Sequence, residues 1–119
     1  EMVSLGEALG GRPETFYGLS GFGDLVATCT GDWSRNRNLG LSIGRGKQAA
    51  TVISEQRSVV EGFAATDCFH SLCKAKDLEA PILSEIKAIL HEGKSPPEAL
   101  NSLMNRELKR ESKTPFATG

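Results

Sequence analysis

The sequence has little of what builds disulfide-linked, metal-binding or membrane proteins. Its 119 residues include three cysteines, none in C-x-x-C spacing, and two separate histidines, His70 and His91. This cysteine pattern argues against a disulfide framework and a zinc site, and two lone histidines argue against a histidine-based metal centre. No apolar run approaches the ~18 residues of a membrane span, and no signal peptide is visible. We therefore expect a soluble, cytoplasmic protein with no metal and no membrane partner.

The chain also has no excess of either charge. Its 14 lysine and arginine residues nearly balance 15 aspartate and glutamate residues, which gives a formal net charge of −1. Such a protein has no overall field that would attract nucleic acid, so any phosphate that it binds must be held locally. A length of 119 residues corresponds to one domain.

The two ends of the sequence differ from its middle. Residues 1–10 read as the last turns of a helix closed by Gly10 and Gly11, and this start leads us to expect a piece of a longer protein. Residues 112–119 have no periodicity, which predicts a flexible tail. Residues 1–111 are predicted to form one helical domain.

Apolar residues recur at helical rather than strand spacing along nearly the whole chain. The β-branched run Thr51–Ile53 leaves 48–54 undecided between helix and strand. With no βαβ alternation and no internal repeat, the pattern predicts an all-α domain, a compact bundle of short and medium helices. Helices are predicted at 13–16, 21–30, 34–44, 60–76, 81–92 and 95–104.

Three of these helices have clear apolar faces. Leu39 and Ile43 share one side of the helix over 34–44. Ser95 and Glu98 have the spacing of a capping box, which predicts a helix start there. The inward positions of the helix that starts at Pro81 are expected to be Ile82, Leu83, Ile86, Ile89 and Leu90. Those of the last helix are expected to be Leu100, Leu103 and Met104.

Three closely spaced glycines, Gly18, Gly21 and Gly23, do not form a dinucleotide-binding fingerprint. That fingerprint follows a strand and has the order G-x-G-x-x-G, whereas here the order is reversed and no strand precedes it. We interpret Gly21 and Gly23 as positions where backbone approaches closely beside Asp24.

The segment Ser34-Arg35-Asn36-Arg37 is the strongest candidate for a binding site. Ser34 is a good N-cap, so the free N–H groups of a helix start would lie beside it. The partial positive charge of a helix start and the planar fork of Arg35 both suit a phosphate dianion. An exposed basic turn is the alternative for this segment alone.

Asp24 and Thr28 lie one turn apart on a predicted helix, close in sequence to this segment. Asp24 near a helix start is explained equally well as a favourable cap. If both segments face one pocket, the Asp24 carboxylate can bind a substrate hydroxyl and the Ser34–Asn36 turn can bind a phosphate. This combination suits a small phosphorylated polyol or ketose. Trp33 lies beside that pocket. No lysine lies near Asp24, so the segment reads as half of a site.

Glu61, in the run Val59-Val60-Glu61-Gly62, opens another predicted helix. A glutamate there is usually a partner for the helix dipole; the alternative is a contact with the ribose or amide of a cofactor. His70 is better explained as a partly buried structural residue than as a catalytic one.

Taken together, these blocks resemble the C-terminal helical domain of bacterial-type NAD(P)-dependent glycerol-3-phosphate dehydrogenases. The resemblance runs from about residue 4 to residue 111. Its blocks are Gly18–Val26, Thr28–Thr30, Ser34–Arg37 with Gly40, Val60–Gly62, Pro81–Ile82, Glu92–Pro96 and Met104–Lys109.

The resemblance implies a compact multi-helix domain of the 6-phosphogluconate-dehydrogenase C-terminal-like type. It implies an oxidoreductase that interconverts dihydroxyacetone phosphate and sn-glycerol 3-phosphate with NADH or NADPH, for phospholipid synthesis. The residues expected to bind substrate are Asp24, Ser34, Arg35 and Asn36. Arg35, Val59 and Glu61 are expected on the cofactor side, and Asp24 and Thr28 in the network that supports catalysis.

The resemblance also implies what this chain lacks. The family's general-base lysine lies upstream of the GxGD block, and its cofactor lies mainly on an N-terminal Rossmann domain. We therefore expect this chain to be inactive alone, with that Rossmann domain as its partner and a homodimer as a possible assembly. Two alternatives remain: the helical domain of a different NAD(P)-dependent dehydrogenase, and a non-enzymatic helical module that binds nucleic acid through Arg35, Arg37, Arg45 and Lys47.

Overall fold

The structure, a computed structural model, describes residues 1–55 and 60–108. Across these two ranges it is all-α and contains no strand, which confirms the predicted fold class. The expected tail at 112–119 and the domain boundary at 111 lie outside the described residues. The elements are α1 (Met2–Ala8), α2 (Pro13–Tyr17), the π-helical turn η1 (Leu19–Gly23), α3 (Asp24–Thr30), α4 (Arg35–Gly44), α5 (Ala49–Glu55), α6 (Glu61–Ala75), α7 (Pro81–His91) and α8 (Pro96–Met104).

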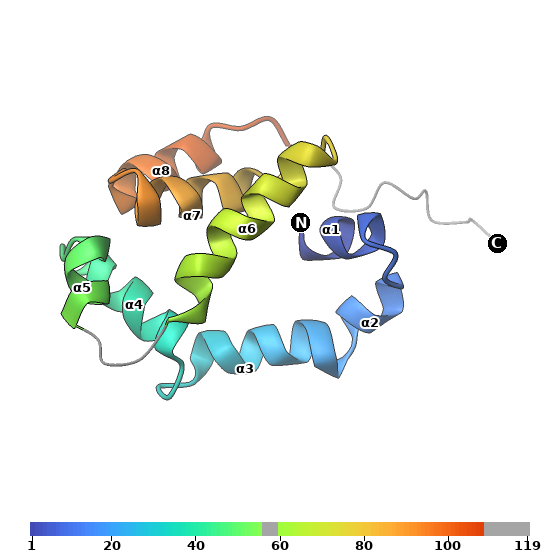
Figure 1. Cartoon of the computed structure of the whole chain (residues 1–119), viewed down its shortest axis with the longest axis horizontal. Helices are drawn as coiled ribbons and strands as arrows, with labels where there is room; N and C mark the ends of the chain where they lie inside the picture. The colour runs from blue at the N-terminus through green and yellow to red at the C-terminus, as the bar shows by residue number, and fades with distance from the viewer. Residues whose placement is uncertain (56–59, 109–119) are drawn as a thin grey trace.

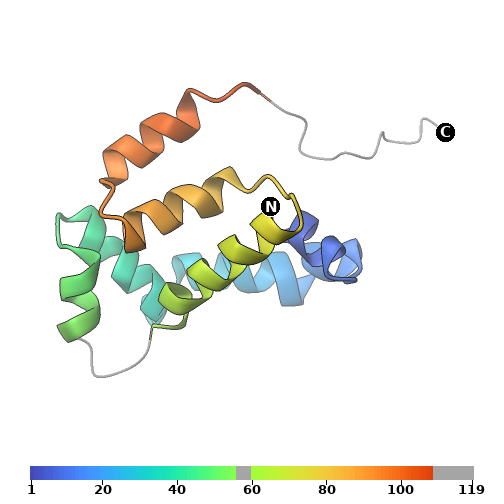
Figure 2. The same cartoon turned by 45° about the horizontal axis from the view of Figure 1, so that its top comes forward.

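Helix α6, 15 residues long, crosses the molecule and organises the other helices (Figure 1). α7 packs against α6, and α8 packs against α7 as the outermost layer (Figure 2). α4 and α5 lie at one end of α6, and α1 and α2 lie at the other (Figure 1). η1 and α3 connect these two ends, and the main contacts of α3 are with its chain neighbours η1 and α4.

The hydrophobic core lies where α4, α5 and the start of α6 meet. Leu39 and Ile43 are both buried, as the sequence predicts. The undecided segment 48–54 is helical, because α5 buries Val52 against this cluster and burial outweighs the weak strand preference of β-branched residues. The buried cluster is Leu39, Ile43, Ala49, Val52 and Val60, with Ile53, Phe63, Ile89 and Leu90 packed against it.

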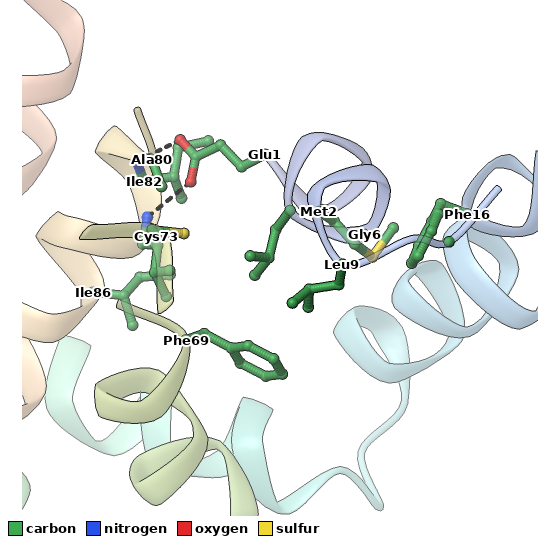
Figure 3. Close-up of a pocket in the computed structure, with 13 residues that line it drawn as sticks. Glu1, Met2, Gly6, Leu9, Phe16, Phe69, Cys73, Ala80, Ile82 and Ile86 are labelled. Atoms are coloured by element: carbon green, nitrogen blue, oxygen red, sulfur yellow. Dashed lines mark hydrogen bonds between the residues drawn. The ribbon is translucent and has the colours of Figure 1, made fainter. Parts of the chain in front are cut away.

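The prediction that every apolar position of α7 faces inward is wrong for two residues. Ile82 is 54 % exposed and Ile86 is 40 % exposed. Both line an apolar cavity of about 510 Å³ between α1, α6 and α7, which Phe69 also lines (Figure 3). The helical periodicity correctly identified the apolar face of α7, but part of that face is turned toward an open cavity.

The last helix departs from its predicted apolar face in the same way. Leu100 and Met104 are both more than half exposed, while Ala99 is buried. The capping box at its start is confirmed: the Ser95 hydroxyl accepts from the Glu98 N–H, and the Glu98 carboxylate accepts from the Ser95 N–H. Of the three predicted inward positions only Leu103 is half-buried, so α8 fully buries a small residue and leaves Leu100 and Met104 outside.

Helix α7 has no capping side chain of its own and receives one from the start of the chain. The two carboxylate oxygens of Glu1 accept hydrogen bonds from the backbone N–H groups of Ile82 (2.7 Å) and Leu83 (3.0 Å), as Figure 3 shows. A carboxylate is stabilised there because a helix start carries unpaired N–H groups and a partial positive charge. This contact ties α1 to α7.

The glycine-rich segment before α3 forms the π-helical turn, in which the Gly23 N–H donates to the Gly18 carbonyl five residues back. Gly21 does allow a close backbone approach, but to α2: a Cβ added at Gly21 would lie 2.1 Å from the carbonyl oxygen of Phe16. At Gly23 the nearest atom belongs to a Leu19 side chain, 3.3 Å away. The predicted close backbone approach is therefore confirmed at Gly21, where the approaching segment is α2, and wrong at Gly23.

The described residues contain neither a membrane-spanning helix nor a cluster of metal ligands. None of their helices is both long and apolar enough to cross a bilayer. No group of 3 or more histidine, cysteine, aspartate or glutamate side chains in these two ranges is arranged to hold a metal ion.

Candidate functional site

The candidate site is a polar hollow of about 360 Å³ near the point where the end of α3, the start of α4 and the start of α6 approach one another (Figure 1). Six residues singled out from the sequence line it, although they come from three different elements and the turn before α4. Trp33, which the sequence places beside the site, lines it as well. The remaining candidate, Val59, lies outside the described residues. The lining residues are Asp24, Thr28, Trp33, Ser34, Arg35, Asn36 and Glu61.

Ser34 lines the hollow and is the N-cap of α4, as predicted. Its hydroxyl oxygen accepts a hydrogen bond from the Arg37 N–H at 3.2 Å, and its carbonyl accepts from the Asn38 N–H at 3.0 Å. The residue is only 3 % exposed. Because the hydroxyl oxygen acts as an acceptor in the cap, its own proton is still able to donate to a ligand.

The two arginines of this turn point to different partners. The Arg37 guanidinium lies 2.8 Å from the Asp32 carboxylate and does not line the hollow. Asn38 donates from its side chain to the Asp32 carbonyl at 2.9 Å, which further fixes the loop before α4. Arg35, on the first turn of the helix, is exposed and lines the hollow. The cationic group of this turn that lines the site is therefore Arg35.

Asn36 makes a contact that the sequence does not reveal. Its side-chain oxygen Oδ1 accepts a hydrogen bond from the backbone N–H of Gly62, 26 residues later, at 3.0 Å. Gly62 is the second residue of α6, and Val60 at the N-cap has no side chain that could accept from it. The sequence contains one hint of such a contact. Because Val60 cannot cap α6 with its side chain, an N–H group at the start of this helix needs an acceptor from elsewhere in the chain.

Asp24 and Thr28 both line the hollow from one face of α3, as their spacing predicts. Asp24 is the first residue of α3, as predicted. The preceding residue Gly23 has helical dihedral angles (φ −61°, ψ −45°), and η1 continues directly into α3. Because helical backbone precedes Asp24, this start of α3 is not a free helix end, and the exposed Asp24 carboxylate lies beside the hollow.

The charges around the hollow are divided by position. Arg35 and the start of α4 provide the cationic side, and the carboxylates of Asp24 and Glu61 provide hydrogen-bond acceptors from α3 and α6. The lining residues include no lysine, histidine or cysteine, so the described part of the site has no nucleophile with an adjacent base. This arrangement can bind and orient a small molecule that has an anionic end and hydroxyl groups.

Both histidines lie outside this arrangement. His91 packs its ring 4.2 Å from that of Phe63, and its Nε2 lies 2.9 Å from the Phe63 carbonyl oxygen, so it links α7 to α6. His70 is half-buried on α6 and does not line the hollow.

This chain is similar in sequence and in structure to known proteins. The family model described as NAD-dependent glycerol-3-phosphate dehydrogenase C-terminus matches residues 1–101. A glycerol-3-phosphate dehydrogenase (NAD(P)+) of Citrifermentans bemidjiense is 46 % identical over 111 residues, which cover 93 % of this chain and 33 % of the relative. One of Oleidesulfovibrio alaskensis is 48 % identical, over 93 % of this chain and 34 % of the relative.

The crystal structure of glycerol-3-phosphate dehydrogenase from Coxiella burnetii has a similar fold, with a TM-score of 0.80 and 38 % sequence identity. The match covers 86 % of this chain and 31 % of that one. The chain thus spans about a third of the length of the relatives it matches.

Proposed function

The chain belongs to the NAD-dependent glycerol-3-phosphate dehydrogenase family as its C-terminal domain, and we propose that it forms the substrate-binding part of an enzyme with that activity. The enzyme interconverts dihydroxyacetone phosphate and sn-glycerol 3-phosphate with NADH or NADPH, for phospholipid synthesis. The observation that carries the proposal is the convergence of six expected site residues on one polar hollow.

In this proposal the phosphate of the substrate lies at the start of α4. The hydroxyl of Ser34, the guanidinium of Arg35 and the side-chain amino group of Asn36 are all donors, and the helix start adds its own N–H groups and partial positive charge. Asp24 holds a substrate hydroxyl, and Thr28 supports it from the next turn of α3.

The cofactor would touch this chain only at its edge. Glu61 at the start of α6 accepts hydrogen bonds from a ribose or carboxamide, and Arg35 lies near it on the same hollow. Val59 is proposed on the cofactor side as well. The described residues contain no strand that could form a dinucleotide-binding fold. The main cofactor-binding site is therefore assigned to an N-terminal Rossmann domain. When bound, the nicotinamide supplies or removes the hydride, and the side chains of this chain orient the substrate for it.

Residues 1–111 are proposed as the substrate-binding domain of a cytoplasmic enzyme that forms a homodimer and binds neither membranes nor nucleic acid. Two ion pairs support the absence of nucleic-acid binding. Arg37 pairs with Asp32 and Lys47 with Glu55, so two of the four basic residues that could have formed a nucleic-acid patch are neutralised locally. The exposed Leu100 and Met104 on α8 offer apolar area for a contact between copies; light scattering of the purified enzyme measures its mass.

The test is a chimera in which this chain replaces the matching C-terminal third of the Citrifermentans relative. We expect NADH or NADPH oxidation with dihydroxyacetone phosphate, and no turnover by this chain alone. A folded chimera that is inactive with dihydroxyacetone phosphate, or turnover by the isolated chain, contradicts the proposal.

A further inference from the structure

We propose that Gly62 is a positioning residue that fixes the orientation of the Asn36 side chain in the substrate site. The inference rests on the proposed function, because it assigns to Asn36 a donor role toward an anionic group. It starts from the hydrogen bond that joins the Gly62 N–H to Asn36 Oδ1 across two helices.

This bond determines which end of the Asn36 carboxamide is left for a ligand. A backbone N–H can only donate, so the carboxamide must turn its oxygen toward Gly62. The group that remains is the Nδ2 amino group, which can only donate and for which the described residues provide no hydrogen-bond partner. Beside the hydroxyl of Ser34 and the guanidinium of Arg35, the site then offers three donor groups, which suits the oxygens of a phosphate.

The absence of a side chain at Gly62 is part of the same contact. A Cβ added there would lie 2.6 Å from Asn36 Oδ1, 2.9 Å from its Cγ and 3.2 Å from its Nδ2. Gly62 is not among the glycines with positive φ, so its backbone conformation does not require glycine. Glycine weakens a helix relative to alanine. Space for the Asn36 carboxamide is therefore the structural reason for glycine at this position.

The contact also joins the two sides of the site. Asn36 belongs to the first turn of α4, where the phosphate is proposed to bind, and Gly62 directly follows Glu61, the residue proposed to face the cofactor. One hydrogen bond thus caps α6, orients Asn36 and sets the distance between the substrate side and the cofactor side.

The first experiment needs no ligand. In the chimera, selective ¹⁵N-glycine labelling gives an amide signal for Gly62 that is identified by its disappearance in Gly62→Ala. We expect this signal to shift and to lose protection from hydrogen exchange in Asn36→Ala, and to keep its protection in Asn36→Asp, which retains an acceptor oxygen. A Gly62 signal that is unchanged in Asn36→Ala overturns the inference.

The second experiment uses kinetics. We expect Gly62→Ala to raise KM for dihydroxyacetone phosphate about tenfold, with a smaller change in kcat, because it displaces a ground-state phosphate contact. The matched control is Gly44→Ala on α4, where an added Cβ meets no atom within 4 Å and both constants should stay unchanged. If both residues act through one contact, Gly62→Ala combined with Asn36→Ala should be no worse than Asn36→Ala alone.

Additive losses in the double variant, or an unchanged KM in Gly62→Ala, overturn the inference. Its failure is distinguishable from failure of the proposed function. A folded chimera without turnover contradicts the dehydrogenase assignment, whereas the ligand-free Gly62 signal still decides whether this glycine orients Asn36.

Discussion

The guanidinium of Arg37 lies 2.8 Å from the carboxylate of Asp32, so the loop that enters α4 is tied to the first turn of that helix. The Asp32 side chain is almost fully exposed, and exposed pairs contribute only about 0–1 kcal/mol to stability. The pair matters more for function, because it directs one of the two neighbouring arginines away from the polar hollow.

Arg35 and Arg37 should therefore respond differently to substitution. In the chimera, Arg35→Ala removes a charge-assisted contact worth about 1.5–3 kcal/mol, so KM for dihydroxyacetone phosphate should rise at least tenfold. Arg37→Ala is the matched control and should change KM little, because its partner is Asp32. Equal effects of the two substitutions on KM would contradict the assignment of Arg35 to the phosphate.

Ser34 should contribute to stability as well as to binding. Ser34→Ala removes the acceptor for the Arg37 N–H and should lower the free energy of unfolding by about 1 kcal/mol, as loss of an N-cap typically does. Ser42→Ala on the same helix is the control, since its hydroxyl only donates to the Asn38 carbonyl one turn back. Urea denaturation followed by circular dichroism measures both; equal losses would rule out a special role for the cap.

Leu39 should be among the residues on which the fold depends most. It is 3 % exposed in the core cluster, so Leu39→Ala should cost about 2–5 kcal/mol of unfolding free energy. Leu41 lies two residues later on the same helix and is exposed, so Leu41→Ala should cost much less. Thermal denaturation of the two variants tests the difference, and a comparable loss for Leu41→Ala would place the core elsewhere.

The start of α8 should loosen in acid. The Ser95 hydroxyl and backbone N–H donate to the Glu98 carboxylate, and these bonds hold the pKa of Glu98 below its ordinary value of 4.5. A carboxyl whose pKa is lower in the folded state stabilises the fold above its ordinary pKa, and this contribution is lost as the pH falls through the lowered pKa.

Amide hydrogen exchange of Ser95 and Glu98, measured across this pH range, checks the expectation. Exchange should accelerate as the carboxyl is protonated, beyond the intrinsic change with pH. Glu98→Gln, which cannot titrate, should lose this additional pH dependence. If Glu98→Gln keeps the additional pH dependence of exchange, a group other than Glu98 causes it.

Local rules predicted the parts of this fold that depend on neighbours in the sequence. The Ser34 cap, the capping box at Ser95 and the buried pair Leu39 and Ile43 are all confirmed. Each depends on residues within about one helical turn, where spacing determines which groups can meet.

Contacts between distant segments could not be predicted in this way. The bond from Gly62 to Asn36 and the bonds from α7 to Glu1 join residues 26 and more positions apart. The pattern of α7 also shows that Ile82 and Ile86 are on its apolar face, but it cannot show that this face lines an open cavity. Six of the expected site residues meet in one hollow, and their roles in binding and catalysis stay predictions.

The π-helical turn before α3 has a consequence for how this region tolerates insertions and deletions. A π turn holds one residue more than an α turn, and one residue corresponds to about 100° of rotation around a helix axis. The wide turn at Leu19–Gly23 takes up its extra residue within one turn, so deleting one residue there would restore an ordinary turn and keep the face of α3 that carries Asp24 and Thr28. A single deletion within α3 has no such slack and would turn one end of that helix against the other by this angle. Leu19–Gly23 is thus the place in this segment where the chain length can change by one residue while Asp24 and Thr28 still face the hollow.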